Sequence, residues 1–353
     1  MTAQINLNLA TIHFTASIKE ALEKINQNGL QICFILNQEN KLVGSITDGD
    51  VRRYLLKNGS IQDIVTSAMS KNTITTSSAL PRRQALEFMI NKSILVLPLV
   101  NGNNQILDLY TVKALSTPQI KQNPVFIMAG GFGTRLRPLT DSTPKPMLPV
   151  GNRPILEIII SHLKSFGFIN FYISTHYLPE VIQNYFGDGE RFGVHITYVH
   201  EHEPLGTGGA LGLLPKDISD LPLIMMNGDI LTNLDFEMAL EAHANKQAVA
   251  TMCVHEFDYQ IPYGVVESNN QQITQLVEKP KYTFHINTGI YILNHSIIKS
   301  INTGTVISMP DILQAEINKK HNVSIFPLHA YWLDIGQMTN YNKAQQDILT
   351  LGI

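Results

Sequence analysis

The sequence is poor in charged residues. Only 16% of its 353 residues are Asp, Glu, Lys or Arg, against roughly 25% in an average globular protein. The net charge is -3. Because binding to nucleic acid depends on clustered Lys and Arg, this composition excludes a broadly basic nucleic-acid binder.

Cysteines are also few, and no long apolar run is present. Cys33 and Cys253 stand 220 positions apart, which excludes a disulfide framework and a cysteine metal cluster. No apolar run approaches the roughly 18 residues that span a bilayer. Residues 1–14 lack the charged start and apolar core of a secretory signal. We therefore expect a cytoplasmic protein with reduced thiols.

Hydrophobic residues make up 44% of the chain, enough to build cores, and the length predicts two domains. The first third contains an internal repeat. Shifting the sequence by 64 positions places Thr11 on Thr75 and Ile32 on Val96 without a gap. Each copy predicts a helix (18–26 and 81–90), an apolar strand (32–36 and 95–100), a polar turn and a second strand.

The first copy ends in Gly44-Ser-Ile-Thr-Asp-Gly-Asp-Val-Arg-Arg53. This segment resembles the end of a cystathionine-β-synthase (CBS) motif, and the two copies resemble a CBS pair over residues 1–120, with repeats of about 1–58 and 59–118. The resemblance implies that Thr47 and Asp50 hold an adenine nucleotide. In the second copy Ala114 replaces Asp50, so we expect at most one such site. A dimerisation module without a ligand is the alternative.

The polar segment 116–124, with two prolines, predicts a linker. After it, strands alternate with longer helices, which is typical of an α/β domain with a βαβ-type sheet. Strands are expected at 125–129, 171–175 and 221–226, and helices at 154–166, 178–186 and 236–245. The sequence thus predicts a second domain over residues 121–353.

A glycine-rich turn, Gly130-Gly-Phe-Gly133, directly follows the first of these strands. Backbone amides in such a turn can surround a phosphate. Leu136 stands where a dinucleotide fingerprint needs its last glycine, and no Gly-Lys-Ser/Thr follows, so neither of those motifs applies. Cations follow instead: Arg135, Arg137, and Lys145 between two prolines that restrict its backbone.

The segment from Ala129 to Leu148, AGGFGTRLRPLTDSTPKPML, resembles the signature of the sugar-1-phosphate nucleotidyltransferases. Further segments of the family follow in order: EPLGTGGAL at 203–211, NGD at 227–229, YG at 263–264, EKP at 278–280, NTG at 287–289 and WLDIG at 332–336. The resemblance covers residues 124–347. It implies a Rossmann-like, GT-A-like fold with a mixed sheet.

The resemblance also implies the reaction and its residues. A sugar-1-phosphate oxygen attacks the α-phosphorus of a nucleoside triphosphate and releases pyrophosphate. The catalytic residues that it implies are Arg135, Lys145 and Asp229. The implied nucleotide-binding residues are Ala129, Gly130, Gly131, Gly133, Thr134, Glu201, Pro204 and Gly206. The implied sugar-phosphate-binding residues are Gly264, Glu278, Lys279 and Asn287.

The resemblance assigns a metal, expected to be Mg²⁺, to Asp229 and Asp334, because hard oxygen ligands suit this ion. The fold must bring these two residues together across about a hundred positions. Trp332, the only tryptophan, is expected to pack beneath Asp334. Gln337-Met338 replaces the family's usual Thr-Pro, so the sequence gives no prediction for this loop.

The nucleotide is expected to be GTP. Glu201 matches a position that meets the base in relatives, and a carboxylate accepts from the two adjacent donors of guanine, whereas uracil and thymine suit an amide. The sequence also resembles guanylyltransferases that act on glucosamine-1-phosphate, with mannose-1-phosphate as the alternative sugar. We expect a homo-oligomer.

Two other classes of function fit the sequence less well. A nucleotide-sensing regulatory protein without turnover is expected to lose a catalytic cation or carboxylate, yet Arg135, Lys145, Asp229 and Asp334 are all present. A glycosyltransferase needs a DxD motif in the second domain. None occurs there; the one at 48–50 lies inside the repeat.

Overall fold

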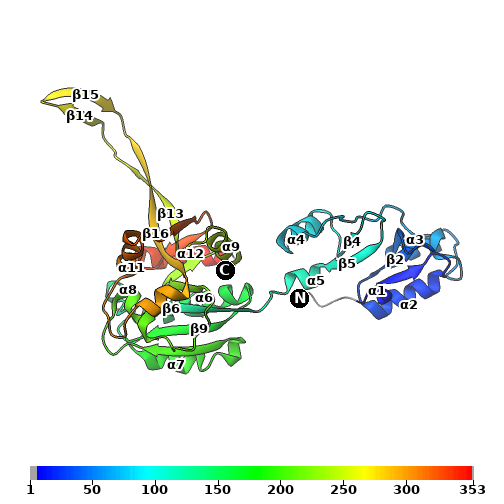
Figure 1. Cartoon of the computed structure of the whole chain (residues 1–353), viewed down its shortest axis with the longest axis horizontal. Helices are drawn as coiled ribbons and strands as arrows, with labels where there is room; N and C mark the ends of the chain where they lie inside the picture. The colour runs from blue at the N-terminus through cyan, green and yellow to red at the C-terminus, as the bar shows by residue number, and fades with distance from the viewer. Residues whose placement is uncertain (1–5, 81, 352–353) are drawn as a thin grey trace. The chain divides into compact units, whose positions relative to one another are not determined.

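A computed structural model describes residues 6–80 and 82–351 of the chain. It divides into two units, Met1–Pro118 and Gln119–Ile353, drawn in blue to cyan and in green to red in Figure 1. None of the described helices combines the length and the apolar character that a membrane crossing requires.

The first unit contains the two copies of the repeat. The elements of the first copy are α1 (Leu7–Ala10), β1 (Thr11–His13), α2 (Ile18–Asn28), β2 (Ile32–Leu36), β3 (Leu42–Thr47) and α3 (Asp48–Leu55). Those of the second are α4 (Arg82–Asn91), β4 (Val96–Val100), β5 (Ile106–Thr111) and α5 (Val112–Ser116). Pro81, where the second helix was expected to begin, lies outside the described residues.

The offset of the repeat recurs in the pairing of the strands. Ile32 pairs with Thr47 in the first copy, and Val96 pairs with Thr111 in the second. Both hairpins have a register shift at the same place, after Ile35 and after Leu99. The two copies are therefore structural as well as sequence repeats.

The second unit is built on a seven-stranded sheet in the order β10-β9-β6-β11-β16-β13-β17. Its strands are β6 (Lys121–Met128), β9 (Phe168–Thr175), β10 (His195–His200), β11 (Leu223–Asn227), β13 (Ala250–Gln260), β16 (Lys281–Leu293) and β17 (Val323–Pro327). β16 runs antiparallel to both neighbours, while the other adjacent pairs are parallel. The predicted mixed sheet is thus confirmed.

Alternation along the strands sends side chains to two separate cores. Val125 and Ile127 of β6 face one core, whereas Phe126 between them faces the other. The helices on the first side are α6 (Ile155–Ser165), α7 (Pro179–Phe186), α9 (Phe236–Asn245) and α12 (Met338–Leu351). Those on the second are α10 (His295–Ser300) and α11 (Met309–Asn318). The sheet is covered on both faces, so its central strand β11 and the second half of β6 are apolar runs.

The connection between the units is shorter than the predicted linker 116–124. α5 ends at Ser116 and β6 already begins at Lys121. The Lys121 amide donates to Gly167 O (2.8 Å), and the Asn123 side chain donates to Pro222 O (2.8 Å). Pro124 fits within the strand because the register of the β6–β9 pair shifts between Lys121 and Pro124.

A two-stranded extension of β13 and β16 projects from the sheet (Figure 1). We call residues 255–286 the arm. Its pairs run without interruption from His255 opposite Ile286 to Gln260 opposite Lys281. A second hairpin, β14 (Val265–Asn269) with β15 (Gln272–Val277), forms the tip.

His243 of α9 is 2% exposed and lies between Thr251 Oγ1 (2.8 Å) and Asn294 Oδ1 (3.0 Å). Burial lowers its pKa below the usual value for histidine. The unfolded chain therefore takes up a proton at a pH where the folded protein does not, so the folded state loses stability as the pH falls.

We predict that the free energy of unfolding decreases between pH 7.5 and pH 5.5, and that His243→Gln flattens this dependence. The lost contribution is about 1.4 kcal/mol for each unit by which the pKa is lowered. Urea unfolding at both pH values measures it, with the exposed His329→Gln as control. An unchanged slope in His243→Gln would contradict the assignment.

Candidate active site

A cavity of about 490 Å³ opens at the carboxyl ends of β6 and β11, the edge where open α/β sheets bind ligands. Segments far apart in the chain meet there. The lining residues are Met128–Leu136, Lys145, Pro146, His176, Glu201, Pro204, Gly206, Thr207, Asn227–Asp229 and Gly336. All predicted nucleotide-binding residues are among them.

Two glycines of the turn at 130–133 have different structural roles. Gly133 has a φ of +61°, and a Cβ there would lie 2.9 Å from Thr140 Cγ2. Gly131 has no such constraint: a Cβ at this position would meet nothing within 4 Å. Gly133 is therefore needed by the fold of the loop, whereas Gly131 leaves its backbone open to the cavity.

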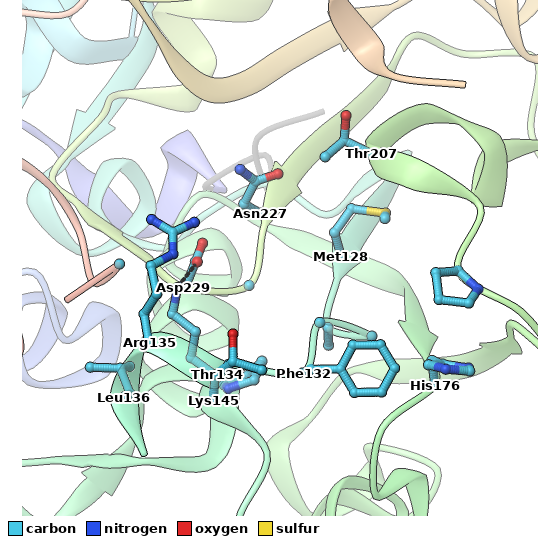
Figure 2. A pocket seen from close by; sticks show the side chains of 18 of the residues that line it. Met128, Phe132, Thr134, Arg135, Leu136, Lys145, His176, Thr207, Asn227 and Asp229 are labelled. Carbon is cyan, nitrogen blue, oxygen red and sulfur yellow. Dashed lines mark hydrogen bonds and ion pairs between the residues drawn. The ribbon is translucent and has the colours of Figure 1, made fainter. Parts of the chain in front are cut away.

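The charged groups gather on one side of the cavity (Figure 2). Lys145 forms an ion pair with Oδ2 of Asp229, and the Arg135 side chain points toward the same place. Lys145 and Asp229 are both largely enclosed, with side chains 15% and 22% exposed. Their interaction is therefore less screened than a surface ion pair.

Asp334 is brought beside Asp229 by two short strands. β12 (Ile230–Thr232) pairs antiparallel with β18 (Trp332–Asp334), so that Ile230 opposes Asp334. The Ile335 amide also donates to Asp229 O (3.0 Å). Desolvation, and then the negative charge of Asp229, raise the pKa of Asp334. Trp332 donates its ring N–H to Thr288 O (3.0 Å).

These two carboxylates could hold a divalent cation. Oδ1 of Asp229 is buried and has no hydrogen-bond partner, an arrangement that costs free energy unless another group binds there. Carboxylate oxygens suit a hard cation, and only two are present, so water or phosphate oxygens would have to complete the coordination. No group of three or more His, Cys, Asp or Glu suited to a metal occurs in the described chain.

Glu201 lines the cavity but is only 3% exposed. Ser174 Oγ donates to its Oε1, and the Leu205 amide donates to its Oε2 (3.1 Å). Both oxygens of its carboxylate are therefore hydrogen-bonded within the protein and hold the cavity wall in place. Each oxygen keeps a second lone pair for a further donor.

Sequence reasoning missed part of the lining. Phe132 and His176 meet edge to face, with ring centroids 5.3 Å apart, on the side opposite the charges (Figure 2). His176 Nδ1 donates to Glu201 O (2.7 Å). Thr207 and Asn227 lie within the family segments EPLGTGGAL and NGD, and these segments were the only sequence signal for the two residues. Phe132 is 46% exposed, an exposure that no sequence pattern indicates.

The predicted sugar-phosphate residues do not line this cavity. Gly264, Glu278 and Lys279 lie on the arm, where Lys279 N donates to Tyr263 O (3.3 Å). Asn287 stands at the base of the arm opposite Val254, and its side chain donates to the Tyr291 hydroxyl (2.6 Å). The continuous strand pairing holds the three arm residues away from the sheet.

A second cavity, of about 360 Å³, lies in the first unit. Both copies of the repeat line it, through Ile32, Thr47 and Asp48 of the first and Ile94 to Val96 of the second. Asp50 is not in the lining. Its carboxylate accepts from Thr47 Oγ1 (2.6 Å) and from Arg53 (2.6 Å), so it caps α3 together with Thr47.

Comparison with known families gives two matches. Residues 125–350 match the model of the family described as nucleotidyl transferase. The chain belongs to this family. Residues 3–57, the first copy of the repeat, match the CBS domain. Both predicted resemblances are thus confirmed, with the CBS match confined to the first copy.

Two proteins of similar sequence are guanylyltransferases by name. Mannose-1-phosphate guanylyltransferase 1 of Arabidopsis thaliana is 35% identical over 61% of this chain and 62% of its own length. The D-glycero-alpha-D-manno-heptose 1-phosphate guanylyltransferase of Aneurinibacillus thermoaerophilus is 33% identical over 63% of this chain and 96% of its own. The chain thus spans less than two thirds of the plant relative.

Solved structures of similar fold are also found. HddC from Yersinia pseudotuberculosis is 28% identical, with a TM-score of 0.52, over 64% of this chain and 99% of its own. Its complex with GMP-PN has a TM-score of 0.50, with the same identity and coverage.

We predict that Gly133→Ala destabilises the protein while Gly131→Ala does not. A left-handed non-glycine residue costs roughly 1–2 kcal/mol, before the contact with Thr140 is counted. At Gly131 alanine instead restricts the unfolded chain, which stabilises by up to about 1 kcal/mol. Urea unfolding compares the two, and equal losses would contradict the assigned roles. A loss of nucleotide binding in the stable Gly131→Ala protein would then report a ligand close to residue 131.

Proposed function

We propose that this protein transfers a nucleotidyl group from a nucleoside triphosphate to a sugar-1-phosphate and releases pyrophosphate. The observation that carries the proposal is the convergence of Arg135, Lys145 and Asp229 beside an open glycine turn at the carboxyl edge of the sheet. Membership of the nucleotidyl transferase family supports it.

The chemistry needs cations rather than a base. A phosphate monoester has a second pKa of about 6 and is already anionic at neutral pH. Its oxygen forms a bond to the α-phosphorus, and the bond from that phosphorus to the pyrophosphate oxygen breaks. The barrier lies in bringing like charges into line. The planar guanidinium of Arg135 can donate two hydrogen bonds to phosphate oxygens that share a negative charge. The ammonium group of Lys145 supplies a localised positive charge next to Asp229.

We assign Asp229 and Asp334 as ligands of Mg²⁺. The ion would neutralise phosphate charge when bound, and the unpartnered Oδ1 of Asp229 supports its fit. In the protein alone, Lys145 occupies the other oxygen of Asp229. We expect this lysine to turn toward phosphate when substrate and metal enter, because the cation would compete with Lys145 for the carboxylate and the phosphate would compete with Asp229 for the ammonium group.

The nucleotide we propose is GTP. The free lone pairs of the Glu201 carboxylate can accept from the two donors of guanine, and two relatives in sequence are guanylyltransferases by name. For the sugar we propose glucosamine-1-phosphate, with mannose-1-phosphate as the alternative that the names of relatives support.

Pyrophosphate release from four nucleoside triphosphates against a set of sugar-1-phosphates tests this proposal. We expect turnover with Mg²⁺ and GTP, and a loss on the order of 10²-fold or more in Asp229→Asn. The control is Asp220→Asn, which removes the same charge from an exposed residue. Binding of nucleotide without release of pyrophosphate would favour a sensing protein, and full activity of Asp229→Asn would refute the metal assignment.

For the first unit we propose binding of an adenine nucleotide in the 360 Å³ cavity, which both copies line as one ligand spanning the pair would require. Thr47 is the predicted ligand that reaches this cavity. Asp50 would have to leave the helix cap to take part.

Titration calorimetry of the full chain with AMP and ATP tests this site. We expect heat of binding in the wild type and its loss in Leu95→Trp, because Leu95 lines the cavity and a larger ring would fill it. Leu56→Trp is the matched control, since Leu56 is 80% exposed in the same unit. No heat with either nucleotide would exclude an adenine-nucleotide site and leave the dimerisation module as the function of this unit.

A further inference from the structure

The last helix of the chain, α12, holds the peptide group that follows Asp334. Asn340, in the first turn of this helix, donates from Nδ2 to Asp334 O (2.6 Å). The N–H of the same peptide group, that of Ile335, donates to Asp229 O (3.0 Å). The peptide group is therefore held from both sides, which fixes the backbone from which the Asp334 carboxylate extends.

Further side chains of α12 bind a second loop that is distant in the sequence. We call residues 149–154, two short antiparallel strands and their turn, the hairpin. Its Pro149 carbonyl accepts from the Tyr341 hydroxyl (2.7 Å) and from Gln345 Nε2 (2.7 Å). Gln345 Oε1 in turn accepts from the Gly151 amide (2.9 Å). Both polar atoms of the Gln345 side chain thus bind the backbone of the hairpin.

The hairpin directly continues the segment that carries Lys145. Lys145 begins a short 3₁₀ turn, which is closed by the Leu148 amide donating to Lys145 O (3.1 Å). Pro146 and Pro149 restrict the backbone along this path, and Leu148 is buried. Because so short and stiff a segment absorbs little displacement, the position of the hairpin sets the position of Lys145.

The apolar side of α12 anchors the helix independently of these bonds. Ala344 is fully buried, and Ile348 packs against the core on this side of the sheet. The hydrogen bonds of Asn340 and Gln345 end instead on the backbone of two loops of the site. These bonds therefore hold the loops, whereas apolar contacts attach the helix.

Lys145 needs such a support most when substrate is bound. In the protein alone it is held by its ion pair with Asp229, and a metal ion and a phosphate would open that pair. The bonds from α12 to the hairpin join neutral groups on both sides. They therefore persist when the ion pair opens.

We propose that three side chains of α12, those of Asn340, Tyr341 and Gln345, are positioning residues for the reaction. Acting through one rigid helix, they fix Asp334 and Lys145 relative to each other. This role rests on the proposed transferase function. A metal ligand and a phosphate-binding ammonium group must meet the same substrate, and a misplacement of about 1 Å can cost on the order of 10²-fold in rate.

The first test measures kcat and KM for pyrophosphate release. Asn340→Ala frees one side of the helix, and Tyr341→Phe combined with Gln345→Met frees the other with little change in side-chain size. We expect kcat to fall about 10-fold or more in each variant, with the KM for the nucleoside triphosphate close to the wild-type value because the glycine turn is unchanged. The control is Gln346→Met, on the exposed face of the same helix. An unchanged kcat, or a loss confined to KM, would overturn the proposal.

The second test asks whether the helix couples its two sides. If the two sets of bonds act in series, breaking either one already releases Asp334 and Lys145 from each other. We therefore expect the triple variant, with Asn340→Ala added to the other two changes, to be about as slow as the slower of its parents. Losses in kcat that multiply would show two independent local contacts and would refute the positioning role.

The third test examines the metal site without using activity. Mn²⁺ is added to the full chain without nucleotide, and the free ion is measured by electron paramagnetic resonance. Asn340→Ala is expected to weaken Mn²⁺ binding about 10-fold, as the loss of a group that supports a metal ligand commonly does. Gln346→Met again serves as control, and circular dichroism compares the folded fractions. Equal affinities in Asn340→Ala and the wild type would contradict the support of Asp334 by α12.

A failure of the transferase function has a different signature. In that case wild-type protein releases no pyrophosphate from any substrate pair, while the Mn²⁺ affinities still report whether Asn340 supports Asp334. Turnover by the wild type together with an equally fast triple variant refutes the positioning role alone.

Discussion

The pairing of β12 with β18 is the constraint on which the site depends. It places two carboxylates, Asp229 and Asp334, next to each other at the edge of the sheet, where burial and mutual repulsion raise the pKa of Asp334. Such a placement is unfavourable by itself. Lys145, and Arg135 at longer range, offset the repulsion, and the two cations thereby come to lie where phosphates would enter.

The glycine loop follows from the same constraint. Lys145 can reach Asp229 only if the loop that precedes it passes close by, and the left-handed turn at Gly133, packed against Thr140 and Lys145, makes that path possible. Gly228, directly after β11, must likewise lack a side chain, since a Cβ there would lie 2.7 Å from Met128 O. The absence of side chains at these positions is thus a requirement of the charge arrangement as well as of an open cavity.

Much of this was predictable from the sequence, for physical reasons that differ between elements. The strand at 125–129 is a continuous apolar run, which is what burial on both faces of a sheet produces. The helix at 236–245 has the bounds that its pattern predicts, because Asp235 caps its start. The residues of the glycine loop were found because they are consecutive. The repeat was visible because each copy keeps the same spacing between strand pairs.

The rest depends on contacts that no local pattern contains. The linker was predicted too long, because prolines usually end a strand and here a register shift accommodates Pro124. The sequence motifs did not indicate that both oxygens of Glu201 hold the cavity wall. Nor does alternation of aromatic residues over 257–259 and 282–284 tell whether their face is covered, since alternation reports only that one face is apolar.

The separation of Lys279 from the cavity also has an electrostatic rationale. Arg135 and Lys145 face Asp229 and Asp334, so two positive groups oppose two negative groups when no substrate is bound. A further ammonium group fixed among them would have no carboxylate to pair with, and a buried unpaired charge is costly. On the arm, Lys279 instead remains exposed to solvent. A chain with so few charges thus carries no uncompensated ammonium group at this position in its own core.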